Sequence, residues 1–423
     1  MYRRECDFII EATRLDRPFS WPAQTPNDLN WNFVLRVLLD NRMSGLAHWR
    51  LNKAGVVIPE LAELEAHYRS NQFRNTIFLD EAARILRAFS QADVPVLPTK
   101  GILWIDSACP VGARKMGDID LLVPRGHHQR AIEVMQTIGY VTGHKSHASE
   151  LGQKDSVDLF LVKGTHCVPV DVSRRFLHKA DDHGTNMSLE AVFQRAHART
   201  LAGVETKELD VIDQLIHTAA HVVLHHELRF LPGIVDVCAL IQRSPGFDWT
   251  ALEQRAKECG MWRPTLCALG LAQELYELSL ADHIESQWRT LRKRIERGPE
   301  VQFLDRLWIL GDAQAAIMKE KGGGWRRSLA LFFLRLDLAD YAAQRLQRLT
   351  RLFWPDRTRM FKTYRVKHPV AVWALRFIHV PVLLIALIVG LPLLWAIRPL
   401  IGARIRTKLG NRCMPSAGPS PNQ

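Results

Sequence analysis

Apolar residues in the first quarter of the chain recur at intervals of three and four positions. The segments 33–38 (FVLRVL) and 77–86 (IFLDEAARIL) show this spacing. Because an α-helix turns once in about 3.6 residues, such spacing gathers the apolar side chains on one helix face. The pattern therefore predicts several amphipathic helices between Asn27 and about Ala92.

The spacing changes to that of β-strands near residue 94. Four short runs of branched and apolar residues have the length and composition of strands. Between the second and third runs, residues 129–138 form a helical stripe that ends at Gly139, a residue type that commonly stops a helix. This alternation predicts a small domain with a mixed sheet. The predicted strands are 94–97 (VPVL), 118–123 (DIDLLV), 157–162 (VDLFLV) and 167–172 (CVPVDV), the last two joined by a turn containing Gly164.

Helical spacing returns after residue 181 and continues to about residue 280. The predicted fold class is therefore α+β, with a small mixed-sheet core flanked by N- and C-terminal helices. Residues 326–367 are rich in arginine, leucine and phenylalanine, which predicts a basic amphipathic helix against a membrane or a partner.

Residues 377–397 contain no Asp, Glu, Lys or Arg, and their number is close to what a helix needs to cross a bilayer. We predict a transmembrane or membrane-inserted segment here; a buried apolar helix is the alternative. The predicted regions are 1–92 (helical), 93–180 (mixed-sheet core), 181–325 (helical), 326–376 (basic and amphipathic), 377–401 (membrane segment) and 402–423 (basic, partly disordered tail).

Composition narrows the class of protein only slightly. The formal charge of +12 suits polyanions, nucleotides or an anionic membrane face, and charge alone does not choose among them. No RNA-binding motif is recognisable, so no specific nucleic acid is predicted. The seven cysteines are scattered without a CxxC pair, which argues against a zinc ribbon and a disulfide framework. Glu5 and Asp7 interrupt the apolar run that a signal peptide would need.

Two aspartates in the second predicted strand are the main candidates for chemistry. Side chains alternate along a strand, so Asp118 and Asp120 should project to one side while Ile119 and Leu121 face the other. Paired carboxylates repel each other unless a cation such as Mg²⁺ lies between them. A third acid commonly completes such a cluster, and Asp171 in the fourth predicted strand fits that position.

Lys100 and Gly101 lie where the first predicted strand turns into a helix. Glycine there allows close backbone approach, and the lysine can place a positive charge on phosphate oxygens. Arg114, four residues before Asp118, is a further candidate for an anion contact. These three residues are predicted to bind nucleotide phosphates.

At these positions the chain resembles the polymerase-beta-like nucleotidyltransferase superfamily, whose pattern is a glycine turn, Asp-x-Asp and a later acidic strand. More closely, it is similar to the uncharacterised nucleotidyltransferase family, which has a Lys-Gly turn, an arginine and an Asp-Ile-Asp-Leu-Leu-Val strand. Lys100 with Gly101, Arg114 and the segment 118–123 match these features, Asp171 corresponds to the later acid, and the resemblance covers roughly residues 30–265.

The resemblance implies transfer of a nucleoside monophosphate from an NTP to an acceptor hydroxyl. Asp118 and Asp120 would hold two Mg²⁺ ions, and Asp171 would bind the second ion and favour deprotonation of the acceptor. The acceptor is unknown; a sugar, a glycan precursor or a small metabolite is plausible. The expected location is the cytoplasmic face of a membrane, the inner membrane if the protein is bacterial.

Two other functions remain open at this stage. The chain could be a catalytically weak or inactive nucleotidyltransferase-fold module that its tail recruits to a membrane assembly. Alternatively, it could act on RNA or on a protein side chain, which its basic charge permits.

Histidines recur every four residues at His217, His221 and His225, and His226 follows directly. This spacing could place imidazoles together for a metal, although no HExxH motif is present. Packing, or a role in closing the cleft, is the alternative. Asp236, further along, is expected to be a structural partner of a basic residue.

Overall fold

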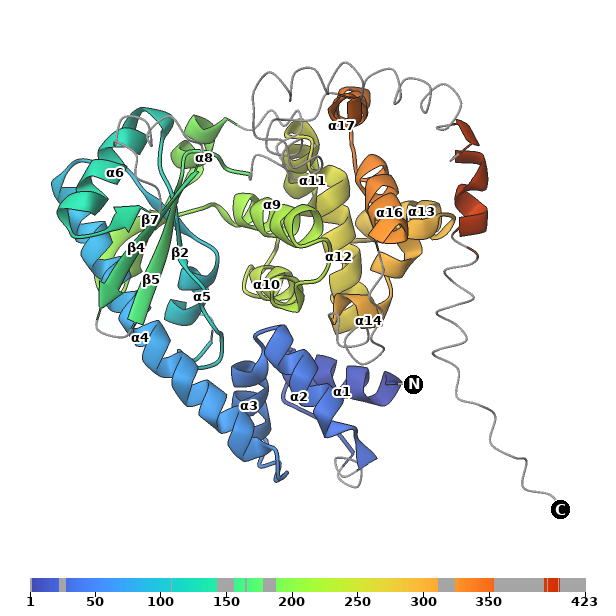
Figure 1. The fold of residues 1–423 in the computed structure, drawn as a ribbon, viewed down its shortest axis with the longest axis horizontal. Helices are drawn as coiled ribbons and strands as arrows, with labels where there is room; N and C mark the ends of the chain where they lie inside the picture. The colour runs from blue at the N-terminus through green and yellow to red at the C-terminus, as the bar shows by residue number, and fades with distance from the viewer. Residues whose placement is uncertain are drawn as a thin grey trace.

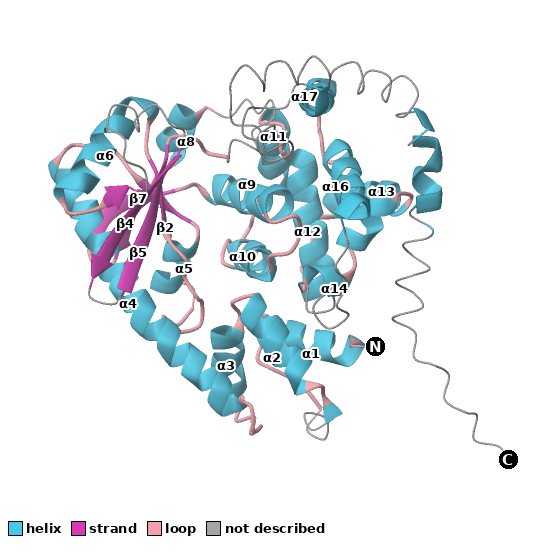
Figure 2. Cartoon of the chain, viewed as in Figure 1, coloured by secondary structure: helices cyan, strands magenta, loops and turns pink. Residues whose placement is uncertain are grey.

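The computed structural model describes residues 2–22, 28–107, 109–142, 156–163, 166–177, 188–310, 324–353, 392–393, 395–401 and 403. Helices form most of the described chain, and the strands gather at one end of the molecule (Figure 2). The predicted α+β class is confirmed by these elements.

The N-terminal part consists of helices, as the apolar spacing predicted. Asn30 begins the second helix, because its side chain accepts a hydrogen bond from the backbone N–H of Phe33 and satisfies one unpaired donor of the first turn. The helices are α1 (Arg3–Thr13), α2 (Trp31–Asp40), α3 (Ser44–Lys53) and α4 (Leu61–Gln91).

Five strands form one mixed sheet in the order β1-β2-β5-β4-β3. The pair β2 and β5 is parallel, and the other neighbouring pairs are antiparallel. The strands are β1 (Leu97–Thr99), β2 (Ile119–Leu122), β3 (Val141–Thr142), β4 (Ser156–Lys163) and β5 (His166–Ser173); between them lie α5 (Gly101–Ser107), η2 (Arg125–His127) and α6 (His128–Thr137).

The first strand begins later than predicted. Residues 94–96 form the loop between α4 and β1 and do not enter the sheet. The N–H of Val94 donates to the carbonyl of Phe89 at 2.9 Å after Asp93 adopts a positive φ of 52°, and this bond closes the C-terminal end of α4. The other three predicted strands are confirmed to within two residues. The predicted turn residue Gly164 lies outside the described residues.

One face of the sheet is covered by α4 and α6. Ile119, Leu121 and Val123 project to this face and share a buried core with Phe78 of α4 and Met135 of α6. Leu122, the alternate residue, belongs instead to the core of the flanking helices. The alternation predicted for this strand therefore holds for its apolar side chains.

A second sheet lies within the region predicted to be entirely helical, so that prediction was wrong here. After α8 (Leu189–Arg195), β6 (His197–Leu201) and β7 (Val204–Glu208) form an antiparallel hairpin. Ala202 and Gly203 turn the chain with φ values of 49° and 75°, the left-handed region that a two-residue hairpin turn requires. Most side chains of both strands are polar, so the sequence does not show the alternation of apolar and polar residues by which a strand is predicted.

The remaining helices pack beside the sheet and above the N-terminal helices (Figure 1). They include α9 (Val211–Ala220), the π-helix η3 (His221–His225), α10 (Leu231–Gln242), α11 (Trp249–Glu258) and α12 (Trp262–Tyr276). Further along are α13 (Asp282–Glu296), η4 (Pro299–Phe303), α14 (Arg306–Ile309), α16 (Gly324–Asp337) and α17 (Ala342–Phe353).

The N-terminal and C-terminal helices share one hydrophobic core, which contains both Phe8 and Tyr276. Polar contacts cross the same boundary. The hydroxyls of Thr13 and Tyr276 lie 2.9 Å apart, and Arg14 donates to the carbonyl of Tyr276 at 2.8 Å. The N-terminal helices thus pack continuously with the C-terminal helices.

The basic amphipathic region contains two helices, α16 and α17, and residues 354–376 lie outside the described residues. Asp340 stands at the break between the two helices, where its carboxylate accepts hydrogen bonds from the N–H groups of Trp262 and Arg263. The predicted single helix over 326–367 is therefore wrong within its described part.

No helix among the described residues is both long and apolar enough to cross a membrane. Most of the predicted membrane segment, 377–391, lies outside them. The described end of that segment packs against the helical part of the protein. Arg398 is buried there beside Glu300 and Asp337, and the rings of Trp395 and Phe333 lie 5.4 Å apart.

Candidate active site

Three aspartates lie side by side across the sheet. Asp120 of β2 pairs in register with Asp171 of the parallel strand β5, and Asp171 pairs with Asp158 of β4. Residues paired across neighbouring strands project to the same face, so these carboxylates form a row. Asp118 directly precedes β2 and lines the same cavity as the row.

The cavity in front of this row has a volume of about 400 Å³. The sheet supplies the carboxylates. His217 of α9, His221 of η3 and Phe230, which directly precedes α10, line another side. Lys100, Gly101 and Arg114 also line it. The structure therefore brings all six sequence-predicted site residues to one cavity, whose size suits a small-molecule substrate.

The carboxylates lie in an environment that disfavours their negative charge. Burial raises the pKa of Asp118. The neighbouring carboxylates of Asp120 and Asp158 raise that pKa further, and Lys100 and Arg42 oppose the rise. Burial also raises the pKa of Asp171, to about 6, against a hydrogen bond from the Ser156 hydroxyl. Carboxylates so placed gain stability from an added cation.

Lys100 provides one positive charge at the row. Its Nζ donates to Oδ1 of Asp120 at 2.7 Å, and about a quarter of its side chain remains exposed. Burial lowers the pKa of Lys100, but Asp120, Asp171 and Asp118 outweigh that effect and raise it overall. The backbone of Lys100 has a φ of 57°, an unfavourable conformation for a residue with a side chain. Such conformations concentrate at functional sites.

Gly101 follows at the start of α5 and packs tightly. A Cβ atom there would lie 2.5 Å from Sδ of the buried Met116. The loop that carries Met116 is fixed by α4, since the guanidinium of Arg74 donates to the carbonyls of Met116 and Gly117 at 3.2 and 3.3 Å. The contact between this turn and the loop that leads into Asp118 therefore favours glycine at position 101.

Arg114 forms an ion pair with Asp236 of α10. This contact bears out the expectation that Asp236 partners a basic residue. The guanidinium of Arg114 lines the cavity while it links the loop before β2 to the helical wall. Its predicted contact with nucleotide phosphate stays a prediction.

Among the cavity residues that sequence reasoning missed, three bear on the carboxylates. Arg42 comes from the turn between α2 and α3, where no local motif marks it, and it lowers the pKa of Asp118. Ser156 and Asp158 are two residues apart on β4 and face the row. Ser156 and Asp158 alternate with Val157 and Leu159. This alternation could have predicted that both polar side chains project to the same face of the strand.

The residues present fit a divalent cation. Oxygen ligands are what Mg²⁺ prefers, and Asp118, Asp120 and Asp171 supply carboxylates at one cavity. The raised pKa values of Asp118 and Asp171 are the physical sign that these carboxylates lack sufficient positive charge from the protein alone.

The mixed sheet, the carboxylate row and the cavity define an enzyme of the nucleotidyltransferase class. The chain belongs to the uncharacterised nucleotidyltransferase family, whose sequence model matches residues 27–277. This span extends from just before α2 to the end of α12 and contains the whole sheet and every cavity residue named above. Membership implies a nucleoside triphosphate as donor substrate. The search of curated proteins and the search of solved structures each found no match.

Proposed function

We propose that the protein transfers a nucleoside monophosphate from an NTP to an acceptor hydroxyl in a Mg²⁺-dependent reaction. The oxygen of the acceptor attacks the α-phosphorus, the bond to the bridging oxygen of the β-phosphate breaks, and pyrophosphate leaves. The observation that carries this proposal is the in-register pair of Asp120 and Asp171, next to Asp118 and facing one cavity.

The protein's own groups have distinct roles in this reaction. Asp118 and Asp120 would hold two cations together with the triphosphate, and Asp171 favours removal of the acceptor proton. Lys100 places its ammonium group at the triphosphate, and Gly101 and Arg114 line the same part of the cavity. When bound, Mg²⁺ would neutralise phosphate charge and lower the pKa of the attacking hydroxyl.

A sugar or glycan precursor is the acceptor class that we favour. The helical wall presents Phe230, an aromatic ring, beside histidines that burial keeps neutral. A mixture of ring faces and hydrogen-bonding groups suits a hydroxyl-rich ligand.

The proposal includes attachment to the cytoplasmic face of a membrane through residues 377–401, supported by the uncharged stretch 377–397. Protease treatment of right-side-out and inverted vesicles tests this orientation. Cleavage of the region containing the carboxylates from the right-side-out vesicles would contradict it.

The activity is tested with the purified full chain, α-labelled NTPs and pooled acceptors. We expect Mg²⁺-dependent incorporation of label and release of pyrophosphate. Asp118→Asn keeps the shape of the side chain but removes its charge, so turnover should fall by on the order of 10³-fold or more.

Asp80→Asn is the matched control, because Asp80 is exposed on α4 outside the cavity. This variant should keep full activity. Turnover that persists in Asp118→Asn, or NTP binding indifferent to both Mg²⁺ and that substitution, would refute the mechanism and favour a binding module.

A further inference from the structure

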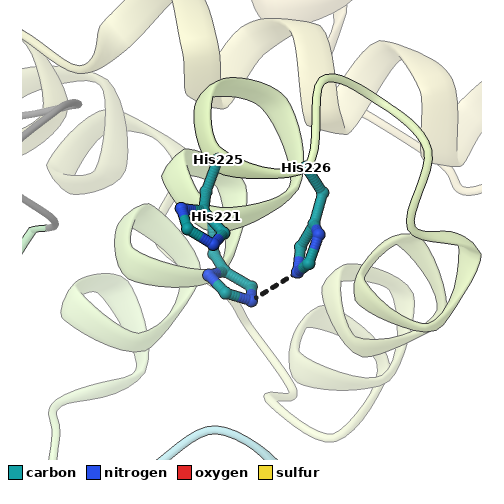
Figure 3. Close-up of side chains that lie close together, drawn as sticks. All are labelled: His221, His225 and His226. Atoms are coloured by element: carbon teal, nitrogen blue, oxygen red, sulfur yellow. Dashed lines mark hydrogen bonds between the residues drawn. The ribbon is translucent and has the colours of Figure 1, made fainter. Parts of the chain in front are cut away.

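Three histidines form a compact cluster in the helical wall of the cavity (Figure 3). His221 and His225 are the first and last residues of η3, and His226 follows directly. One ring nitrogen from each lies within 4.8 Å of the others. The Nε2 atoms of His221 and His226 are 2.9 Å apart.

The π-helix creates this convergence. In an α-helix, residues five positions apart differ by about 140° in direction, so His221 and His226 would diverge. Here the N–H of His226 donates to the carbonyl of His221 at 2.9 Å, an i to i+5 bond that brings the two side chains to one side. Single π-turns of this kind occur frequently at functional sites.

The ring geometry leaves room for a shared ion. Zinc–nitrogen bonds of about 2.0–2.1 Å in a tetrahedral arrangement place ligand nitrogens about 3.4 Å apart. In the cluster, the Nε2 atoms of His221 and His226 lie 2.9 Å apart, which is below this value. One ring nitrogen from each of the three histidines lies within 4.8 Å of the others. Binding of a shared ion would require the side chains to rotate until the nitrogens reach coordination distance.

We propose that His221, His225 and His226 bind one transition-metal ion, Zn²⁺ in the first instance, at a site separate from the carboxylate row. Imidazole ligands select Zn²⁺ and related ions, whereas carboxylates select Mg²⁺. Three protein ligands leave a fourth position for water or another ligand, and all three histidines line the cavity. The site does not depend on the proposed nucleotidyl transfer.

The competing explanation is a purely structural cluster. His226 stacks on Phe230 with ring centroids 4.3 Å apart, and a single hydrogen bond between neutral rings would join His221 to His226. That arrangement requires no metal and predicts no stoichiometric zinc binding.

The test measures zinc binding by the full chain after treatment with a chelator. Titration with ZnCl₂, followed by calorimetry and by metal analysis after gel filtration, should give about one tightly bound ion per chain. His225→Ala should abolish this binding without disturbing the fold, because His225 is the exposed member of the cluster. His226→Ala should do the same.

Two controls separate this site from others. His283→Ala removes an exposed histidine of α13 far along the chain, and Asp118→Asn alters the carboxylate row; both should bind zinc as the original chain does. Zinc retained by His225→Ala and His226→Ala, or absent from the original chain, would overturn the proposal.

A spectroscopic measurement on the unmodified chain keeps the test independent of folding in the variants. Co²⁺ in place of Zn²⁺ should give the visible absorption of a tetrahedral site with nitrogen ligands. Absorption typical of an octahedral, all-oxygen site would show that the ion had bound elsewhere and would equally overturn the proposal.

Discussion

At the scale of single residues, the contact between Lys100 and Asp120 has two consequences. The ammonium neutralises one carboxylate at 2.7 Å, so it helps the protein to keep a row of acids in one cavity. It also occupies an oxygen that a divalent cation would use. In the proposed mechanism, Lys100 and the cation would compete at Asp120, and cation binding would free the lysine for phosphate.

This competition predicts an unusual pair of effects for Lys100→Met. Affinity for Mg²⁺ without nucleotide should rise, because the competing ammonium is gone, while turnover should fall by about 10²- to 10³-fold through loss of charge on the triphosphate. Calorimetry with Mg²⁺ and the labelled NTP assay measure the two effects.

Lys207→Met is the control, since Lys207 is exposed on β7 outside the cavity, and neither quantity should change. Weaker Mg²⁺ binding by Lys100→Met would show that the lysine does not compete with the cation.

At the scale of elements, the turn from β1 to α5 depends on the absence of a side chain at Gly101. Gly101→Ala would place its Cβ 2.5 Å from Sδ of buried Met116, so either the thioether or the turn must move. We expect the free energy of unfolding to fall by about 1–3 kcal/mol, the usual cost of overpacking. Urea unfolding measures the change.

Gly126→Ala provides the comparison for this prediction, because a Cβ there meets nothing within 4 Å. Its unfolding free energy should change by less than about 0.5 kcal/mol. Equal stability of the two variants would mean that Met116 relaxes at no cost.

The sequence predicted those elements whose residues carry a strong local signal. The strand around Asp120 was predicted because charged and apolar residues alternate, and the helix ending at Gly139 because its apolar spacing stops at a glycine. The hairpin around Gly203 was missed, since polar side chains hide its alternation. Arg42 was missed for another reason: only tertiary packing brings it to the carboxylates.

At the scale of the whole molecule, the described C-terminal residues are tied to the helical part by a buried charge cluster. The guanidinium of Arg398 contacts Glu300 at 2.6 Å and also Asp337, and both carboxylates are fully buried. Burial raises the pKa of Glu300 to about 8, against the opposing effect of Arg398. Arg398 thus favours the charged form of carboxyls that water does not reach.

Arg398→Leu removes that positive charge and should lower the free energy of unfolding by up to about 3 kcal/mol, because the buried carboxylate of Asp337 then keeps only Arg294, at 2.8 Å, as its ion-pair partner. Chemical denaturation measures the difference. Arg289→Leu breaks an exposed pair with Glu285 and should cost less than about 1 kcal/mol. A smaller loss for Arg398→Leu than for Arg289→Leu would contradict this assignment.

The residues that line the cavity extend in sequence from Arg42, in the N-terminal part, to Asp236 of α10. The strands of the mixed sheet lie between these two positions in the sequence. A fragment that ends at β5 therefore carries the carboxylates without the opposing wall that α9, η3 and α10 supply. Its cavity is incomplete until the chain extends past residue 236.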